Sequence, residues 1–97
     1  IFLKSGMLDK AEEALKKAES LEAHEMIYFN LGVLYGKFKK FELSIDYFKK
    51  ALSLNLKNAD TYFNLAISYT NLNNQEEAEK ALEKAKYLNS GYEKFTL

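Results

Sequence analysis

The chain carries YFNLGVLY at residues 28–35 and YFNLAISY at residues 62–69, 34 positions later. The same shift of 34 places Glu42 on Glu76. Self-similarity at a period of 20 to 50 residues is the signature of a repeat architecture, in which each copy is one supersecondary unit. The sequence therefore predicts stacked copies of a single unit.

The front of the chain belongs to the same pattern. A shift of 33 residues aligns residues 16–18, which read Lys-Lys-Ala, with the same letters at residues 49–51. The same shift places Phe2 on Tyr35. Three copies in phase within 97 residues indicate a partial first repeat followed by two fuller ones.

The apolar residues follow a helical period. In each copy, one stretch places apolar side chains three or four positions apart, which is one face of an α-helix. These residues are Leu8, Ala11, Leu15, Ala18 and Leu21; Ile45, Phe48, Ala51 and Leu52; and Ala78, Ala81, Leu82, Ala85 and Leu88. We expect the other helix of each pair from Glu25 to Lys37 and from Ala59 to Leu72. The breaks between helices are short, so neighbouring helices form antiparallel hairpins.

The aromatic and small residues of these hairpins follow a known pattern. The pattern reads aromatic-x2-Leu-Gly-x2-Tyr, followed later by small-x3-aromatic, where x is any residue. This pattern resembles the tetratricopeptide repeat. It is carried by Tyr28, Leu31, Gly32, Tyr35, Ser44 and Phe48, and in the next copy by Tyr62, Leu65, Ala66, Tyr69, Ala78 and Leu82. The resemblance implies an all-α fold: a right-handed superhelical stack of antiparallel helical hairpins, or α-solenoid.

Small residues have a physical role in this pattern. Gly32 and Ala66 let the two helices of a hairpin approach closely, because a larger side chain would hold the backbones apart. Ala11, Ser44 and Ala78 do the same from the second helix. The places of the family's usual proline between repeats are taken by other residues, namely Ala23, Leu56 and Ser90.

We expect one domain over residues 1–97. It divides into a partial first repeat at 1–23, a second repeat at 24–57, a third at 58–91, and the start of a capping helix or a tail at 92–97. The chain opens on Ile1 rather than methionine, so we expect a piece of a longer protein.

Charge and composition exclude several classes of function. Fourteen basic residues, all of them lysine, balance fourteen acidic ones, so no overall field attracts nucleic acid or an anionic membrane. No apolar run has the length of a membrane span. We therefore expect no nucleic acid and no membrane among the partners, no cofactor, and a cytoplasmic location by default.

Catalytic chemistry has little material here. His24 is the only histidine, and we expect it in the turn between the first and second repeats, beside Glu22 and Glu25. A metal site needs further ligands converging on it. A chain without cysteine also has no thiol nucleophile. We predict no catalytic residue, no metal site and no enzyme activity.

The resemblance implies that the first helix of each pair lines a concave groove for a peptide or a partner helix. Residues of these helices that the hairpin core does not claim should face the groove. They are Phe29, Asn30, Val33, Lys37, Asp60, Phe63, Asn64, Ile67, Thr70 and Asn71, joined by Lys4 from the first copy. Exposed apolar surface of this kind marks interaction sites, and Asn30 and Asn64, 34 positions apart, can orient a peptide backbone. We predict a protein–protein interaction module with a scaffold role.

Two alternatives stay open at this stage. Phe29 and Phe63 could pack against the neighbouring repeat, with the asparagines bonding the adjacent helix. The chain could also form homodimers through its ends, because a repeat end without a polar cap exposes core. The residues that would do so are Ile1, Phe2 and Leu3 at one end and Tyr92, Phe95 and Leu97 at the other.

A chaperone-tail clamp is not predicted. Family members that grip the carboxylate ends of chaperones resemble one another in placing lysine and asparagine along the groove. Phe29 and Val33 stand where that clamp has a lysine and a second asparagine.

Overall fold

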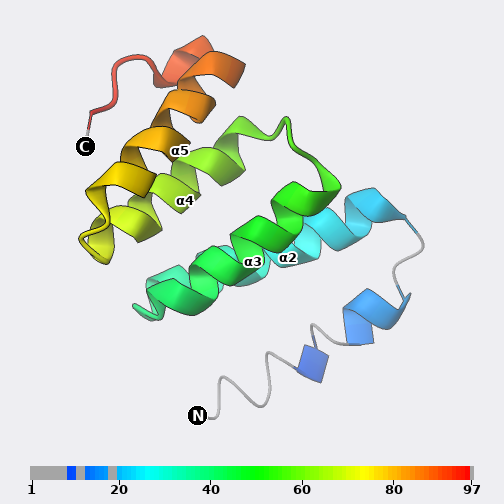
Figure 1. Ribbon diagram of the computed structural model, residues 1–97. Coiled ribbons are helices and arrows are strands. Elements are labelled where there is room, and N and C mark those ends of the chain that lie inside the picture. Colours follow the sequence, from blue (N-terminus) through cyan, green and yellow to red (C-terminus); the bar gives the residue numbers. More distant parts are fainter. Residues whose placement is uncertain (1–8, 11–12, 18–19, 97) are drawn as a thin grey trace.

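The structure is a computed structural model that describes residues 9–10, 13–17 and 20–96. From residue 20 onward the chain forms α2 (Leu21–Lys37), α3 (Phe41–Leu54), α4 (Ala59–Asn71), α5 (Gln75–Leu88) and a short 3-10 helix, η1 (Ser90–Tyr92). Within the described ranges there is no strand. Figure 1 shows the pair α2 and α3 beside the pair α4 and α5. The all-α stack of antiparallel hairpins predicted from the sequence is confirmed.

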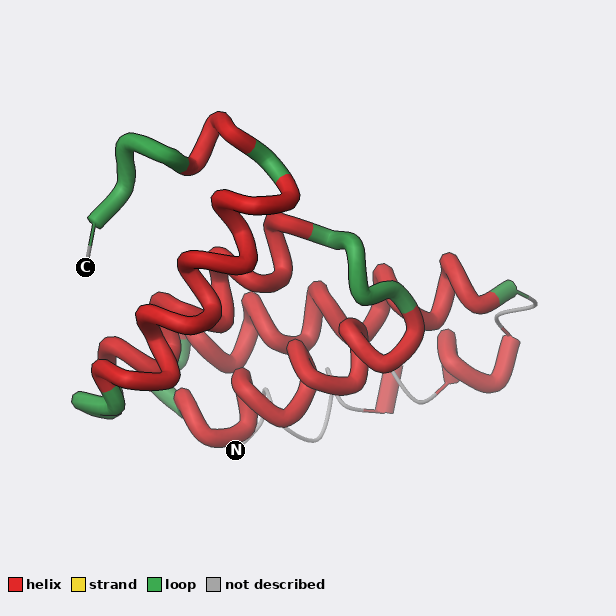
Figure 2. Tube along the Cα trace, turned by 45° about the horizontal axis from the view of Figure 1, so that its top comes forward, coloured by secondary structure: helices red, strands yellow, loops and turns green. Residues whose placement is uncertain are grey.

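Each hairpin turns in the same way. Lys39, between α2 and α3, and Asn73, between α4 and α5, have φ angles of 62° and 60°. These two residues are 34 positions apart, so the left-handed backbone conformation recurs with the period of the sequence. Figure 2 shows how short these turns are, and short turns hold the paired helices antiparallel.

Asparagine side chains start the helices of the last repeat. Oδ1 of Asn58 accepts from the backbone N–H of Thr61 at 3.3 Å, and Oδ1 of Asn74 accepts from that of Glu77 at 3.4 Å. Such N-caps satisfy backbone donors that have no partner within the helix.

Helix α2 begins earlier than expected. We predicted its start at Glu25 and placed His24 in a turn, but α2 begins at Leu21, so both expectations are wrong. The reason is the N-cap Ser20, whose Oγ accepts from the backbone N–H of Ala23 at 3.1 Å. Leu21, expected in the preceding helix, opens α2 and is exposed.

Small residues bring the paired helices together. A Cβ atom on Gly32 would be 2.5 Å from Cε1 of Phe48, so only glycine fits between the α2 backbone and that ring. Ser44, Ala66 and Ala78 are fully buried as well. The predicted close approach is confirmed at Gly32, and the other three positions are buried, whereas Ala11 lies outside the described residues.

One core joins the two hairpins. Side chains of α3, α4 and α5 form a single buried cluster, made of Ile45, Phe48, Leu52, Leu65, Ala66, Tyr69, Ala78, Ala81 and Leu82. Beside it, the hydroxyl of Ser44 donates to the carbonyl of Gly32 at 2.7 Å and lies 3.0 Å from the hydroxyl of Ser68. These bonds connect α2, α3 and α4.

Candidate functional site

A cleft of about 390 Å³ opens where α2, α3 and α4 meet. We call it the central cleft. Its lining consists of Gly32, Val33, Gly36, Lys37, Lys39, Phe41, Ser44, Phe48, Asn64, Ile67, Ser68 and Asn71. Five of the predicted groove residues come together here, namely Val33, Lys37, Asn64, Ile67 and Asn71.

The lining of the central cleft is apolar with a positive charge. Val33 packs against the core and is half-buried, whereas Ile67 keeps 41% of its surface exposed. Lys37 and Lys39 are the charged residues of the lining, and both are exposed. Without a carboxylate among the lining residues, these ammonium groups face an approaching partner unopposed by a local negative charge.

Polar side chains of α4 bond their own helix. Nδ2 of Asn64 donates to the carbonyl of Asp60 at 2.8 Å, and Nδ2 of Asn71 donates to that of Ile67 at 2.9 Å. Oγ1 of Thr70 donates to the carbonyl of Ala66 at 2.9 Å. Asn64 thus bonds its own helix rather than the neighbouring one, which was the alternative considered for it.

Phe29 lies outside the central cleft. It is half-buried, with its ring centroid 5.8 Å from that of Phe48 on α3. Its outer edge borders a second cleft of about 370 Å³, which is lined by Glu22, Glu25, Met26, Phe29, Asn55 and Asn58. In this second cleft the Glu25 carboxylate accepts from Nδ2 of Asn58 at 2.9 Å. Phe29 therefore packs on the second helix of its own hairpin.

Phe63 is half-buried beneath residues of the same chain, and the exposed Asp60 is bonded to one of them. The ring of Tyr92 stacks on that of Phe63 at a centroid distance of 4.6 Å, and the ring of Phe95 lies at 4.9 Å. The Tyr92 hydroxyl donates to the Asp60 carboxylate. Residues 93–96 form no further helix.

The remaining predicted residues are scattered. Asn30 is exposed on α2, Thr70 is half-buried on α4, and Lys4 lies outside the described residues. Conversely, Lys39, Phe41 and Ser68 line the central cleft but were not predicted, because the prediction considered the outward face of the first helices alone. The one sequence feature that could have indicated Ser68 is a polar residue directly before the core residue Tyr69.

Other kinds of site find no support in the described part of the chain. There, no group of three or more histidine, cysteine, aspartate or glutamate side chains is arranged to hold a metal ion. His24 places Nε2 3.0 Å from the carbonyl oxygen of Leu15. Among the same residues, no helix is both long enough and apolar enough to cross a membrane.

Comparison with known proteins agrees with this architecture. Two models of the tetratricopeptide repeat match the chain, one over residues 26–58 and the other over residues 59–92. The search of curated proteins found no match. Repeats of this family are generally protein–protein interaction modules and typically have no enzyme activity. Because the two matches are adjacent and cover most of the chain, the protein belongs to the tetratricopeptide repeat family.

Proposed function

We propose that the protein binds a peptide or helix of a partner protein in the central cleft and so acts as an adaptor. The observation that carries this proposal is Ile67, which is exposed by 41% beside Val33 on the face formed by α2 and α4. Exposure of a branched apolar side chain to water is unfavourable, and a partner that covers the side chain lowers the free energy of the complex.

The chemistry of the cleft limits the occupant. Its volume accommodates one or two side chains of a partner segment, and Val33, Phe41 and Ile67 favour apolar ones. Lys37 and Lys39 favour a partner that carries an acidic residue beside its apolar anchor. Asn64 and Asn71 each use one amide N–H within α4, so each side chain still offers one N–H and its oxygen atom to a peptide backbone.

Ile67 is a better probe of this site than the two phenylalanines. Phe29 packs on Phe48 and Phe63 lies beneath Tyr92, so alanine at either position would disturb the structure as well as any binding surface. Ile67→Glu changes an exposed residue instead. Leu56→Glu is a matched control, because Leu56 is exposed by 67% in the turn between α3 and α4 and does not line the cleft.

The test is a selection of binders from a phage-displayed library of random peptides. Selected peptides, synthesised and titrated, should bind the wild type and lose at least about tenfold in affinity with Ile67→Glu, as at the centre of an interface. Binding to Leu56→Glu should stay within about twofold. A selection that yields only peptides indifferent to Ile67→Glu would overturn the proposal.

Self-association through the ends of the stack remains the alternative. Its residues at the front, Ile1 to Leu3, lie outside the described ranges, and at the other end Tyr92 and Phe95 lie on Phe63. Sedimentation velocity over a wide range of concentrations separates the two functions. A monomer throughout supports adaptor function, and a concentration-dependent dimer supports self-association.

A further inference from the structure

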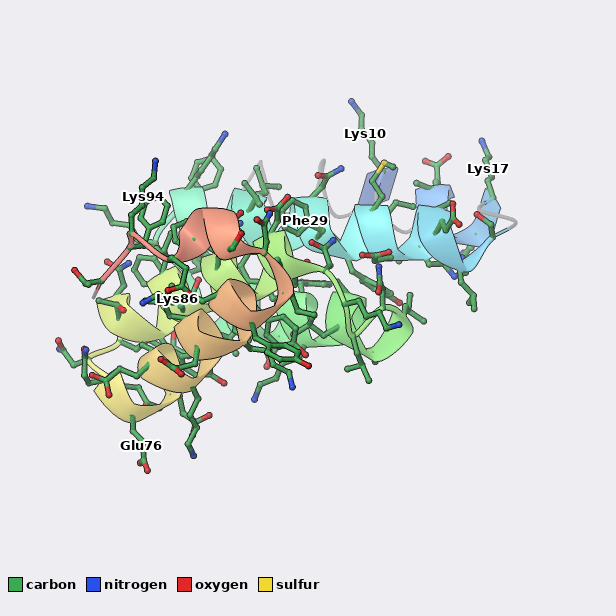
Figure 3. All side chains as sticks on the ribbon, turned by 90° about the horizontal axis from the view of Figure 1, so that it is seen from above. Lys10, Lys17, Phe29, Glu76, Lys86 and Lys94 are labelled. Atoms are coloured by element: carbon green, nitrogen blue, oxygen red, sulfur yellow. The ribbon has the colours of Figure 1, made fainter. Side chains whose placement is uncertain are left out.

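The segment that covers Phe63 lies on the surface like a bound peptide. We call residues 90–96 the C-terminal segment. Phe95 is exposed by 38%, and Glu93, Lys94 and Thr96 are exposed as well. Figure 3 labels Lys94 on this segment and Phe29 on α2. The rings of Tyr92 and Phe95 contact Phe63, and these two rings are 5.8 Å apart.

Backbone N–H groups of the C-terminal segment donate within the segment or to Asn89 directly before it. The backbone N–H of Gly91 donates to Oδ1 of Asn89 at 2.8 Å, and that of Phe95 donates to the carbonyl of Tyr92 at 3.0 Å. The segment's hydrogen bond to α4, within the described residues, is the one from the Tyr92 hydroxyl to Asp60. The segment therefore holds its own shape and is attached to α4 by two rings and one hydroxyl.

The residues that the C-terminal segment contacts continue the face of the central cleft. Asp60, Phe63 or Asn64, and Ile67 follow one another at intervals of three or four on α4, which places them on one face of the helix. Asn64 and Ile67 line the cleft, whereas Phe63 lies one turn away beneath the two rings and the exposed Asp60 accepts from the Tyr92 hydroxyl. A peptide that follows this face would meet both.

We propose that Asp60 and Phe63 form an aromatic subsite of the groove, which the C-terminal segment occupies in competition with a partner segment. The partner segment would carry a tyrosine and, three residues later, a phenylalanine, as Tyr92 and Phe95 do. This inference rests on the proposed function of the groove and names the chemistry of its partner. The two rings stack on Phe63, and the Asp60 carboxylate selects tyrosine by accepting from its hydroxyl.

Occupation by a segment of the same chain is favoured by its tether. A linked ligand acts at an effective concentration of about millimolar, so even a weak contact keeps the subsite filled. A partner gains access when it binds the central cleft first, because its own aromatic pair then also has a high effective concentration at the subsite. Competition of this kind leaves the hairpins unchanged and alters only the C-terminal segment.

The test uses the full chain and a peptide with the sequence SGYEKFT, copied from residues 90–96. The double variant Tyr92→Ala/Phe95→Ala removes the internal competitor. Peptide titrations followed by NMR should give saturable shifts at the amides of Asp60 and Phe63 in the double variant. The wild type should bind the peptide at least about tenfold more weakly, because its own segment occupies the subsite.

Two controls identify the contacts. Adding Phe63→Ala to the double variant should remove saturable binding, while circular dichroism verifies that the helices remain. A peptide with phenylalanine in place of tyrosine should bind the double variant more weakly, and a peptide with alanine in place of both aromatics should not bind.

Three results would overturn the subsite: equal affinity for the wild type and the double variant, no binding to the double variant, or binding that survives Phe63→Ala. Their meaning is separate from that of the library selection. If selected peptides depend on Ile67 while SGYEKFT does not bind, the groove stands and the aromatic subsite falls. If SGYEKFT binds as expected but no selected peptide depends on Ile67, the central cleft falls instead.

Discussion

The ring of Phe48 on α3 lies directly against the backbone of Gly32 on α2, where an added Cβ atom would be 2.5 to 2.9 Å from three ring carbons. Phe48 is buried to 98% and belongs to the core shared by both hairpins, so a shift of its ring disturbs that core. The absence of one side chain on α2 thus determines how closely the first hairpin closes.

Gly32→Ala should therefore destabilise the protein. Overpacking a core costs about 1–3 kcal/mol, and the better helix propensity of alanine returns about 1 kcal/mol. We expect a net loss of up to about 2 kcal/mol in the free energy of unfolding, measured by urea titration. Gly36→Ala is the control, because its Cβ would meet only Oγ of Ser44, at 3.4 Å. That variant should be neutral or slightly more stable; an equal loss in both variants would contradict the explanation.

The hydroxyls of Ser44 and Ser68 should be energetically coupled. Ser44→Ala leaves the buried Ser68 hydroxyl without its partner, which costs about 1 kcal/mol or more. The double variant Ser44→Ala/Ser68→Ala should lose less than the sum of the single variants, because no unpaired hydroxyl remains. Alanine fits this kind of position, as Ala78 at the equivalent place is fully buried. Strict additivity in a double-mutant cycle of unfolding free energies would exclude the coupling.

The two asparagine N-caps should differ in strength. Asn74→Ala removes only the cap of α5 and should cost about 1 kcal/mol. Asn58→Ala removes the cap of α4 and also the bond to the Glu25 carboxylate, so it should cost about 1 kcal/mol more. In Glu25→Ala background the two variants should become alike. Urea titration measures the free energy of unfolding of each variant. If Asn58→Ala still costs more than Asn74→Ala when Glu25 is absent, Glu25 does not have this role.

The Tyr92 hydroxyl, which bonds to Asp60, should lose its proton at a higher pH than an ordinary tyrosine does. The hydrogen bond to Asp60, assisted by burial and the negative charge of Asp60, raises the pKa of Tyr92 to about 12 from its ordinary value of 10.0. Because the pKa is raised in the folded state, the contribution of this contact to stability is complete below about pH 10. It is lost as the pH rises through about 12.

Tyrosinate absorbance as a function of pH tests this shift. The wild type has seven tyrosines, and Tyr92 should give a step near pH 12 in its titration curve. That step should be missing from the curve of Tyr92→Phe. The peptide SGYEKFT lacks Asp60, and its tyrosine should titrate near the ordinary value. If the difference between the wild-type and Tyr92→Phe curves centres near pH 10, the Tyr92 pKa is not raised.

Much of the fold was predictable because its determinants are local and recur. The 34-residue period and the small residues at positions 32, 44, 66 and 78 indicated close helical hairpins, and the structure confirms them. The start of α2 was missed, since the single Ser20 cap extends the helix beyond its apolar pattern.

The site was predictable only in part. Helical spacing grouped Ile67 and Val33 with the groove residues, and both line the central cleft, because spacing along one helix determines which residues lie on the same side. Spacing could not show that Tyr92 and Phe95 return to cover Phe63, or that Lys39 and Phe41 complete the central cleft. The sequence by itself determined the hairpins, since each is stabilised by contacts within one repeat. Which groove residues stay open to a partner was decided by the tertiary structure, because exposure depends on segments that are distant along the chain.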